Sequence, residues 1–381
     1  MNIARKFTAA AAAAATAALL AAPAAATDLR FATGFAPNST GEKGALAWAD
    51  HARDISGGDL NIQVFAQSLL KFTEMSGGVR DGIADMGMVL FPYFPAEYPN
   101  STMISELTML FASMNTGDRG GIAWAGALTE YITQHCPACV EEMKAQNQIY
   151  TSSSSTEYLL MCTKEVKSLA DMQGIRLRAP GAQWTRWAQS VGATTVSIPQ
   201  PEIFEGLTQG ILDCSLQGAA ELVDLSLIDA VKYIVRDVPG GGFGGTGQVN
   251  VNIDTWQALT PEQRTDLLKS AAYHGAVVSW NYHVNNKAAL EKAAEKGIGI
   301  IDPADDLRSH TVAFIENDLA NIARNYQEKY GLKDTEQAVA TFKSIFERWT
   351  GLVADVQSAE ELTDLYWNEA LSKVDVNAYG F

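Results

Sequence analysis

The chain has 381 residues, 47% of them hydrophobic, and a formal net charge of −16 from 28 basic and 44 acidic residues. Such an acidic surface argues against nucleic acid or anionic lipid as a partner. It leaves an anionic small ligand open, because one buried arginine can dominate a pocket. The length exceeds that of one simple hydrophobic core and predicts two domains.

The first residues have the features of a secretory leader. Arg5 and Lys6 precede an Ala/Leu-rich run at 9–22, and Pro23-Ala-Ala-Ala-Thr follows. A basic segment, an apolar segment and an Ala-x-Ala signal predict a signal peptide at 1–26, cleaved after Ala26, and export to the periplasm. A membrane anchor would need about 20 residues more hydrophobic than alanine.

Short strands alternate with helices in the first part of the remaining chain. Prolines between Phe91 and Pro95 predict an extended segment there. Strands are expected at 29–33, 60–65 and 86–90, and helices at 44–55, 72–81, 120–135 and 139–146. Two further strands, at 149–162 and 248–253, are expected to cross between the domains.

The segment at 174–217 predicts βαβ units. Ile175–Arg178 alternates apolar and basic residues, and Pro180 and Gly181 end that strand. Strands joined by helices give a parallel sheet that binds ligands at the carboxyl ends of its strands. Arg178 lies at such an end, and a guanidinium can grip a carboxylate with two parallel hydrogen bonds. The expected helices are 183–191 and 202–208, and the further strands are 194–198 and 211–216.

The last third of the chain is predicted to be helical. Thr260-Pro261-Glu262 opens a helix with a capping residue and a proline in the first turn. Helical spacing resumes from about His310, with breaks near Gly331 and Gln357.

The chain resembles the solute receptors of TRAP (tripartite ATP-independent periplasmic) transporters, of the C4-dicarboxylate-receptor-like kind. The resemblance rests on Ser-Leu-Ala-Asp-Met-Gln-Gly-Ile-Arg-Leu-Arg-Ala-Pro at 168–180, Gly-Ala at 192–193, Pro199 and Glu-Ile-Phe-Glu-Gly-Leu-Thr-Gln-Gly-Ile-Leu-Asp at 202–213. Upstream, Ser-Gly-Gly-Asp-Leu-Asn-Ile-Gln-Val-Phe at 56–65 and Gly-Ile-Ala-Asp-Met-Gly at 82–87 are similar to the family's first domain.

The resemblance implies an α/β fold of the two-lobed periplasmic binding protein type, with two crossing strands, a hinge and C-terminal helices. Lobe one is expected at 27–155 plus part of the region after 250, and lobe two at 156–250. Helices at 300–381 are expected to pack across the lobes.

The resemblance also implies that Arg178 grips the carboxylate of a ligand and that Gln217 adds an amide contact. Many relatives have an arginine or glutamine where this chain has Glu157-Tyr158, so a second carboxylate-binding arginine is not expected. Relatives with a cation bridge have an acid beside an aromatic at the positions of Leu216-Gln217. No metal or cofactor is therefore expected, although Glu157 leaves a calcium or sodium ion open.

Aromatic residues are concentrated where a cleft between two lobes is expected. Either they line an apolar, aromatic-binding wall or they belong to the ordinary core. The aromatic candidates for the ligand site are Phe35, Phe91, Tyr93, Tyr158, Trp184 and Phe243, and Glu157 is a further candidate beside Tyr158. Phe243 belongs to a glycine-rich loop at 240–247, which precedes a strand rather than a helix and does not predict a dinucleotide site.

Four cysteines in an exported chain suggest disulfides. A structural bridge is favoured for Cys136 and Cys139 over a redox or metal role. Cys162 and Cys214 lie in two expected strands, where they either pair or remain separate thiols.

These features together predict a receptor that is not an enzyme. The expected ligand is a small organic acid, preferably a monocarboxylate and possibly aromatic, which the receptor delivers to integral membrane permease subunits. A dicarboxylate, a sugar acid or an ectoine-type zwitterion is the alternative within the family. A secreted hydrolase is the alternative outside it, but the serine run at 151–156 lacks a nucleophile elbow and the five histidines are scattered.

Overall fold

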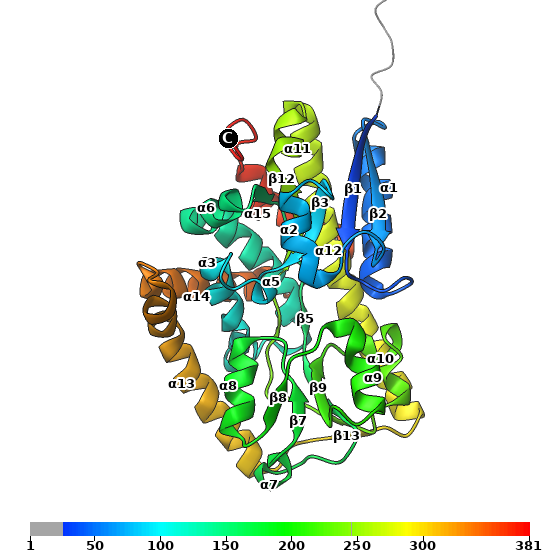
Figure 1. Cartoon of the computed structure of the whole chain (residues 1–381), viewed down its shortest axis with the longest axis vertical. Coiled ribbons are helices and arrows are strands. Elements are labelled where there is room, and N and C mark those ends of the chain that lie inside the picture. The colour runs from blue at the N-terminus through cyan, green and yellow to red at the C-terminus, as the bar shows by residue number, and fades with distance from the viewer. Residues whose placement is uncertain (1–25, 245) are drawn as a thin grey trace, which may run out of the picture.

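The computed structural model describes residues 26–244 and 246–381, and it consists of two lobes, each built on one β-sheet (Figure 1). The predicted leader lies outside the described residues apart from Ala26. Within the described part of the chain, every helix is too short or too polar to cross a membrane. The α/β fold predicted from the sequence is confirmed.

The first sheet has the strand order β2-β1-β3-β12-β4, and its first three strands are parallel. The strands are β1 (Thr27–Thr33), β2 (Leu60–Ala66), β3 (Met86–Leu90), β4 (Gln148–Tyr150) and β12 (Thr246–Asn252). The principal helices of this lobe are α1 (Thr40–Ile55), α2 (Met75–Arg80), α5 (Gly120–Glu130) and α6 (Pro137–Ala145). The predicted extended segment after β3 is wrong, because Phe91–Tyr93 forms a 3₁₀ turn. The prolines permit this turn, since Pro92 occupies an early helical position where no N–H is needed.

The second sheet has the order β13-β10-β6-β9-β7-β8. Its central strand β7 is parallel to both β8 and β9, which confirms the predicted βαβ units. The strands are β6 (Leu159–Cys162), β7 (Arg176–Arg178), β8 (Thr194–Val196), β9 (Cys214–Gln217), β10 (Tyr233–Val235) and β13 (Gly299–Ile301). The helices between them are α8 (Ala182–Ser190), α9 (Ile203–Thr208) and α10 (Glu221–Asp224).

Two extended segments and two long helices connect the lobes. The first segment leads from β4 through β5 (Thr156–Glu157) to β6, so the continuous strand predicted at 149–162 is interrupted. The second leads from β10 through β11 (Gly242–Phe243) to β12, and β5 and β11 pair as an antiparallel ribbon. Helix α12 (Pro261–Glu295) runs from the first lobe to the second, and α13 (Asp305–Tyr330) returns along the opposite side (Figure 1).

The helix ends follow from local chemistry. Thr260 caps α12 by accepting a hydrogen bond from Gln263 N–H, while the Gln263 side chain accepts one from Thr260 N–H. Helix α13 ends at Gly331, whose φ of 67° lies in the left-handed region that glycine tolerates. The predicted break there is confirmed.

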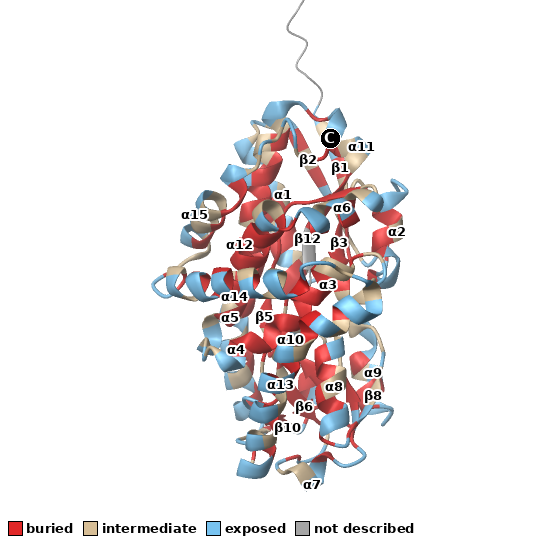
Figure 2. Ribbon diagram, turned by 90° about the vertical axis from the view of Figure 1, so that its left-hand side faces the viewer, coloured by how far each residue is buried: buried red, intermediate tan, exposed pale blue. Residues whose placement is uncertain are grey.

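The apolar side chains form separate cores in the two lobes. The buried residues follow the strands of both sheets and the inner face of α12 (Figure 2). In the second lobe the side chains of β6 alternate between the two faces of the sheet. Leu160 and Cys162 join one cluster, and Met161 joins the other.

Both cysteine pairs form disulfides. Cys136–Cys139 lies at the start of α6, and Cys162–Cys214 joins directly opposed residues of β6 and β9. The structural bridge favoured for the close pair is confirmed. For the second pair, the structure selects the bridged alternative.

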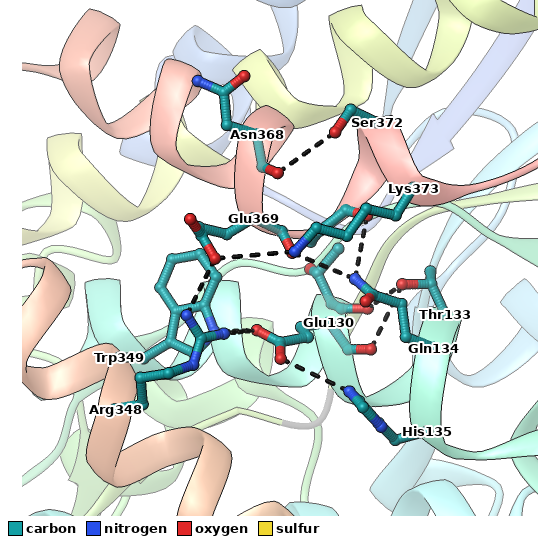
Figure 3. Close-up of polar contacts among 12 residues, drawn as sticks. Glu130, Thr133, Gln134, His135, Arg348, Trp349, Asn368, Glu369, Ser372 and Lys373 are labelled. Atoms are coloured by element: carbon teal, nitrogen blue, oxygen red, sulfur yellow. Dashed lines mark hydrogen bonds and ion pairs between the residues drawn. The ribbon is translucent and has the colours of Figure 1, made fainter.

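The C-terminal helices α14 (Thr335–Leu352) and α15 (Ala359–Glu369) attach to the first lobe through a buried carboxylate (Figure 3). Glu130, only 6% exposed, accepts a hydrogen bond from Trp349 Nε1 at 2.7 Å and forms an ion pair with Arg348. Arg348 also contacts Glu369 at 2.9 Å, nearer to solvent. Glu130 thus joins the end of α5 to α14, and Arg348 extends the connection to Glu369 of α15.

We predict that Glu130→Ala lowers the free energy of unfolding by about 2–4 kcal/mol, because it leaves the buried Trp349 N–H without an acceptor and Arg348 without its inner partner. Glu369→Ala removes the outer contact of the same arginine and should cost less than about 1 kcal/mol. Urea unfolding of both variants measures the difference. Equal losses for the two variants would contradict this account.

Candidate functional site

A cavity of about 50 Å³ lies between the two lobes, beside the β5–β11 ribbon. Met88 and Leu90 contribute aliphatic surface. Its aromatic lining comprises Phe35, Phe72, Tyr93, Tyr158, Phe243 and Tyr282. Its polar lining comprises Ser154, Ser155, Thr156, Arg178, Gln200 and Glu221.

The strand order explains why these side chains meet. Phe35 follows the end of β1, Tyr93 follows β3, Arg178 ends β7 and Glu221 follows β9. In both sheets these are carboxyl ends of parallel strands, where open α/β sheets bind ligands. The two binding edges face each other across the cavity, and the connecting segments and α12 close its remaining side.

Among the described residues, Arg178 is the only basic one that lines this cavity, and it is 2% exposed. Its Nη1 donates to the Leu216 carbonyl at 3.2 Å and to Gln217 Oε1 at 3.1 Å. Its Nη2 lies 3.4 Å from the Tyr93 hydroxyl. Among the described residues no carboxylate lies within ion-pairing distance of Arg178. A buried guanidinium held by neutral acceptors is suited to an incoming anion.

Gln217 lies behind Arg178 rather than in the cavity lining. It is fully buried, and its Oε1 orients the guanidinium. Its Nε2, and the Oγ of Ser155 in the lining, are buried without a hydrogen-bond partner among the described residues. Such unsatisfied groups are costly, which favours a polar guest near them.

Arg176, two residues before Arg178, is a structural residue. Its guanidinium binds Asp213 at 2.8 and 3.0 Å, and these hydrogen bonds hold the pKa of Asp213 well below its usual range. The two arginines of one short strand therefore have different roles: Arg176 has a carboxylate partner in the protein, and Arg178 does not.

An aromatic stack forms one wall of the cavity. The Tyr158 ring lies parallel to Phe243 at 5.9 Å and to Trp184 at 5.2 Å. Trp184 lies behind Tyr158, and its Nε1 donates to the Gly240 carbonyl. The glycine-rich loop is thereby attached to α8, and Phe243 is held against the cavity.

Glu221 is the acidic residue of the cavity lining, and it was not anticipated from the sequence. It is 4% exposed and accepts a hydrogen bond from the Tyr282 hydroxyl at 3.1 Å. Burial, and to a lesser extent the nearby Asp224, raise the pKa of Glu221 from 4.5 to about 8, although Arg178 and the Tyr282 hydroxyl oppose the shift. At neutral pH this carboxyl group is therefore mostly protonated.

The structure brings five of the predicted site residues into the cavity: Arg178, Tyr158, Tyr93, Phe35 and Phe243. Four others lie outside its lining. Gln217 lies behind Arg178, Phe91 packs in the first-lobe core against Tyr98 and Tyr150, and Trp184 packs behind Tyr158. Glu157 lines a second, larger pocket of about 650 Å³, which borders the cavity at Tyr158.

Glu157 accepts a hydrogen bond from Gly121 N–H at 2.7 Å, at the start of α5. Removal from water raises its pKa to about 7. Within the described part of the chain, His, Cys, Asp and Glu side chains form no group of three that could hold a metal ion. The separation of Glu157 from the cavity follows from strand alternation, since Tyr158 next to it faces the cavity.

Sequence reasoning missed Phe72, Gln200, Glu221 and Tyr282. The sequence offered one signal for Glu221, because it follows the end of β9 by four residues and ligands bind at the carboxyl ends of such strands. No local sequence pattern around Tyr282 indicated that it would line the cavity. It reaches the cavity because the long helix α12 passes behind it.

A family model described as "Bacterial extracellular solute-binding protein, family 7" matches residues 31–325. A monocarboxylate 2-oxoacid-binding periplasmic protein of Nostoc sp. is 23% identical over 212 residues, which are 55% of this chain and 54% of that protein. The chain spans about half the length of the curated relatives that it matches.

Solved structures share the fold over nearly their whole length. An extracytoplasmic solute receptor of Bordetella pertussis that binds pyroglutamic acid has a TM-score of 0.70 at 22% identity, covering 84% of this chain and 100% of that one. A TRAP solute-binding protein of Rhodoferax ferrireducens with copurified benzoate has a TM-score of 0.71 at 18% identity, covering 86% and 99%. A marine metagenome protein specific for aromatic acids has a TM-score of 0.72 at 18% identity, covering 85% and 99%.

The Glu221 carboxyl predicts a pH dependence of stability. Its pKa rises from 4.5 to about 8 on folding, so the folded protein binds more protons between these values, and stability falls as pH rises through that window. The loss is at most about 1.4 kcal/mol per pH unit for one group. Glu221→Gln should therefore gain melting temperature relative to wild type between pH 5 and pH 8.

The exposed Glu205→Gln serves as the matched control and should follow the wild-type profile. Differential scanning calorimetry at half-unit intervals of pH measures all three proteins. Parallel profiles for wild type and Glu221→Gln would contradict the assignment.

Proposed function

The chain belongs to the bacterial extracellular solute-binding proteins of family 7, and from that premise we propose that it is a periplasmic receptor for a small organic acid. It captures the acid in the cavity between its lobes and delivers it to the permease subunits of a TRAP transporter. The leader at 1–26 directs its export, and cleavage near Ala26 releases the receptor. Binding is its whole task, and it carries out no chemical step.

The observation that carries this proposal is the buried, unpaired guanidinium of Arg178. Its neutral partners orient it but leave its charge without a counter-ion in the protein. A ligand carboxylate supplies that charge and can accept two hydrogen bonds from one guanidinium. Gln217 positions the guanidinium, while the Tyr158 ring encloses the body of the ligand.

The ligand is a monocarboxylate with an apolar body. One basic residue and six aromatic residues line the cavity, which matches one carboxylate and a flat or compact remainder. Similar proteins bind pyroglutamic acid, benzoate and other aromatic acids, which supports this class. The 2-oxoacid-binding relative is a receptor of monocarboxylates as well.

We take 27–155 with β12 and part of the region after it as lobe one, and the chain from 156 to the start of β12 as lobe two, hinged at the connecting segments. Helix α13 packs against both lobes, whereas α14 and α15 pack on lobe one. Residues from lobe one, such as Tyr93, approach Arg178 of lobe two only when the lobes are closed. Ligand binding then favours closure because the closed form alone provides contacts from both sides.

A panel of intact organic acids tests the function. A receptor gains melting temperature with a narrow set of carboxylates and returns them unchanged, whereas a secreted hydrolase, the alternative from another class, consumes its substrate. Dicarboxylates, sugar acids and ectoine belong in the panel as alternative ligands of the same family. Stabilisation by none of these acids would overturn the receptor proposal.

We predict that Arg178→Ala weakens carboxylate binding by roughly 30-fold to several thousandfold, because truncating one side of a desolvated charge pair costs about 2–5 kcal/mol. Arg178→Lys should restore little, since lysine lacks the two-pronged geometry. Arg176→Ala, on the same strand but paired with Asp213, is the matched control and should retain binding. Calorimetric titration that finds Arg178→Ala within about threefold of wild type would remove the carboxylate anchor.

We predict that Tyr93→Ala releases ligand faster than wild type, because most affinity differences among variants of one site lie in the off-rate. Tyr93→Phe removes only the hydroxyl beside Arg178 and should have a smaller effect. Stopped-flow release rates measure both variants, and small-angle scattering with and without ligand measures closure. An unchanged radius of gyration together with wild-type release from Tyr93→Ala would contradict the closing lobes.

A further inference from the structure

Glu221 places a carboxyl group in the lining of the cavity that Arg178 also lines. It lies in α10, directly after the strand that carries Gln217, and it shares the cavity lining with Arg178. Although both side chains are almost fully buried, they form no ion pair among the described residues. The carboxyl group is therefore not the internal partner of the arginine, and its burial needs another reason.

The surroundings hold Glu221 in place. The Tyr282 hydroxyl donates to its Oε1 at 3.1 Å. The preceding residue is fixed as well, since Ala220 N–H donates to Asn286 Oδ1 at 2.8 Å, and both Tyr282 and Asn286 belong to α12. A carboxyl group held from a long helix presents a fixed acceptor rather than an adaptable surface chain.

The titratable and charged groups around Glu221 come from several elements. Asp224 lies on the same helix and is engaged by Thr40 N–H at 2.8 Å, with Lys43 of α1 nearby. Arg178 comes from β7, Tyr158 from the first crossing segment and Tyr282 from α12. Gln200, before α9, adds a neutral amide. Among the described residues that line the cavity, Arg178 thus contributes the positive charge and Glu221 the carboxyl group.

We propose that Glu221 recognises a hydrogen-bond donor, an O–H or N–H, on the body of the ligand whose carboxylate Arg178 holds. This inference rests on the proposed function and narrows its ligand class. The ligand is then a monocarboxylate with a hydroxyl, amide N–H or ammonium group, rather than a plain aromatic or aliphatic acid. Sites built to hydrogen-bond a substrate group reject analogues without it, because the buried partner is left unsatisfied.

The charge balance of the closed cavity supports this class. With Glu221 protonated, Arg178 and one ligand carboxylate neutralise each other, and a neutral donor leaves the cavity uncharged. If the ligand carries an ammonium group instead, that group pairs with ionised Glu221, and the net charge of the occupied cavity is again zero. A dicarboxylate leaves one buried negative charge uncompensated, which is expensive in a dry site.

The test compares matched acids that differ in one donor. The pairs are 3-hydroxybenzoate against benzoate, mandelate against phenylacetate, and pyroglutamate against cyclopentanecarboxylate, with succinate as the dicarboxylate. Isothermal titration of the full mature chain should show at least one donor-bearing acid bound about tenfold or more tightly than its partner, with succinate weaker than the preferred acid. Equal affinities within every pair, or a preference for succinate, would overturn the inference while leaving the receptor function intact.

Variants of Glu221 test whether this residue causes the preference for donor-bearing acids. Glu221→Met keeps the length of the side chain without its polar group and should reduce the preference to within about threefold. Glu221→Gln keeps an acceptor and should retain most of the preference for neutral donors. The exposed Glu205→Met is the control and should behave as wild type.

Discrimination that persists in a folded Glu221→Met protein would overturn the assignment. If Glu221→Met does not fold, Tyr282→Phe is the second test. It removes the hydroxyl that holds the Glu221 carboxyl group and should reduce the preference for donor-bearing acids. An unaltered preference in Tyr282→Phe would equally contradict the inference. Failure of every monocarboxylate to bind wild type would instead overturn the receptor function itself.

Discussion

The structure depends on the burial of one guanidinium without a carboxylate from the protein. Desolvating Arg178 costs free energy that its carbonyl and amide partners repay only in part. Those partners fix its direction, so its remaining hydrogen-bonding capacity points to the space between the lobes. The positive charge of Arg178 is therefore best compensated by an anion that occupies the space between the two lobes.

How well the charge of Arg178 is compensated depends on the relative position of the two lobes, because the segments that connect the lobes run beside the cavity. The cavity lies at the β5–β11 ribbon, where both extended segments pass from one sheet to the other. Other polar contacts join the same parts. Arg186 of α8 pairs with Asp318 of α13 at 2.6 Å and with Glu106, from the segment between β3 and β4, at 2.8 Å. The two lobes are therefore also joined by ion pairs outside the cavity.

Local patterns in the chain were sufficient for much of the fold and for the centre of the site. The alternation in Ile175–Arg178 and the strand–helix succession after it predict a parallel sheet, and the rule of carboxyl ends then selects Arg178. The family resemblance adds Gln217, and the deeper position of Arg176 on the strand indicates a structural role for it. These patterns did not identify the partner of Arg176, because Asp213 is 37 residues away. The short strands β10 and β13 carried too few residues for a periodic signal.

The sequence by itself determined the class of fold, the acidic surface, the two breaks in the C-terminal helices and the position of the basic anchor, since each depends on neighbouring residues and on strand direction. Only the tertiary structure decided which aromatic residues line the cavity. Phe91 and Tyr93 are two residues apart, yet the 3₁₀ turn directs one into the core and the other to Arg178. It also decided the bridge between Cys162 and Cys214 and the meeting of Glu221 with Tyr282. Such pairs lie far apart in the chain, and their contact arises from how strands and helices pack rather than from any local preference.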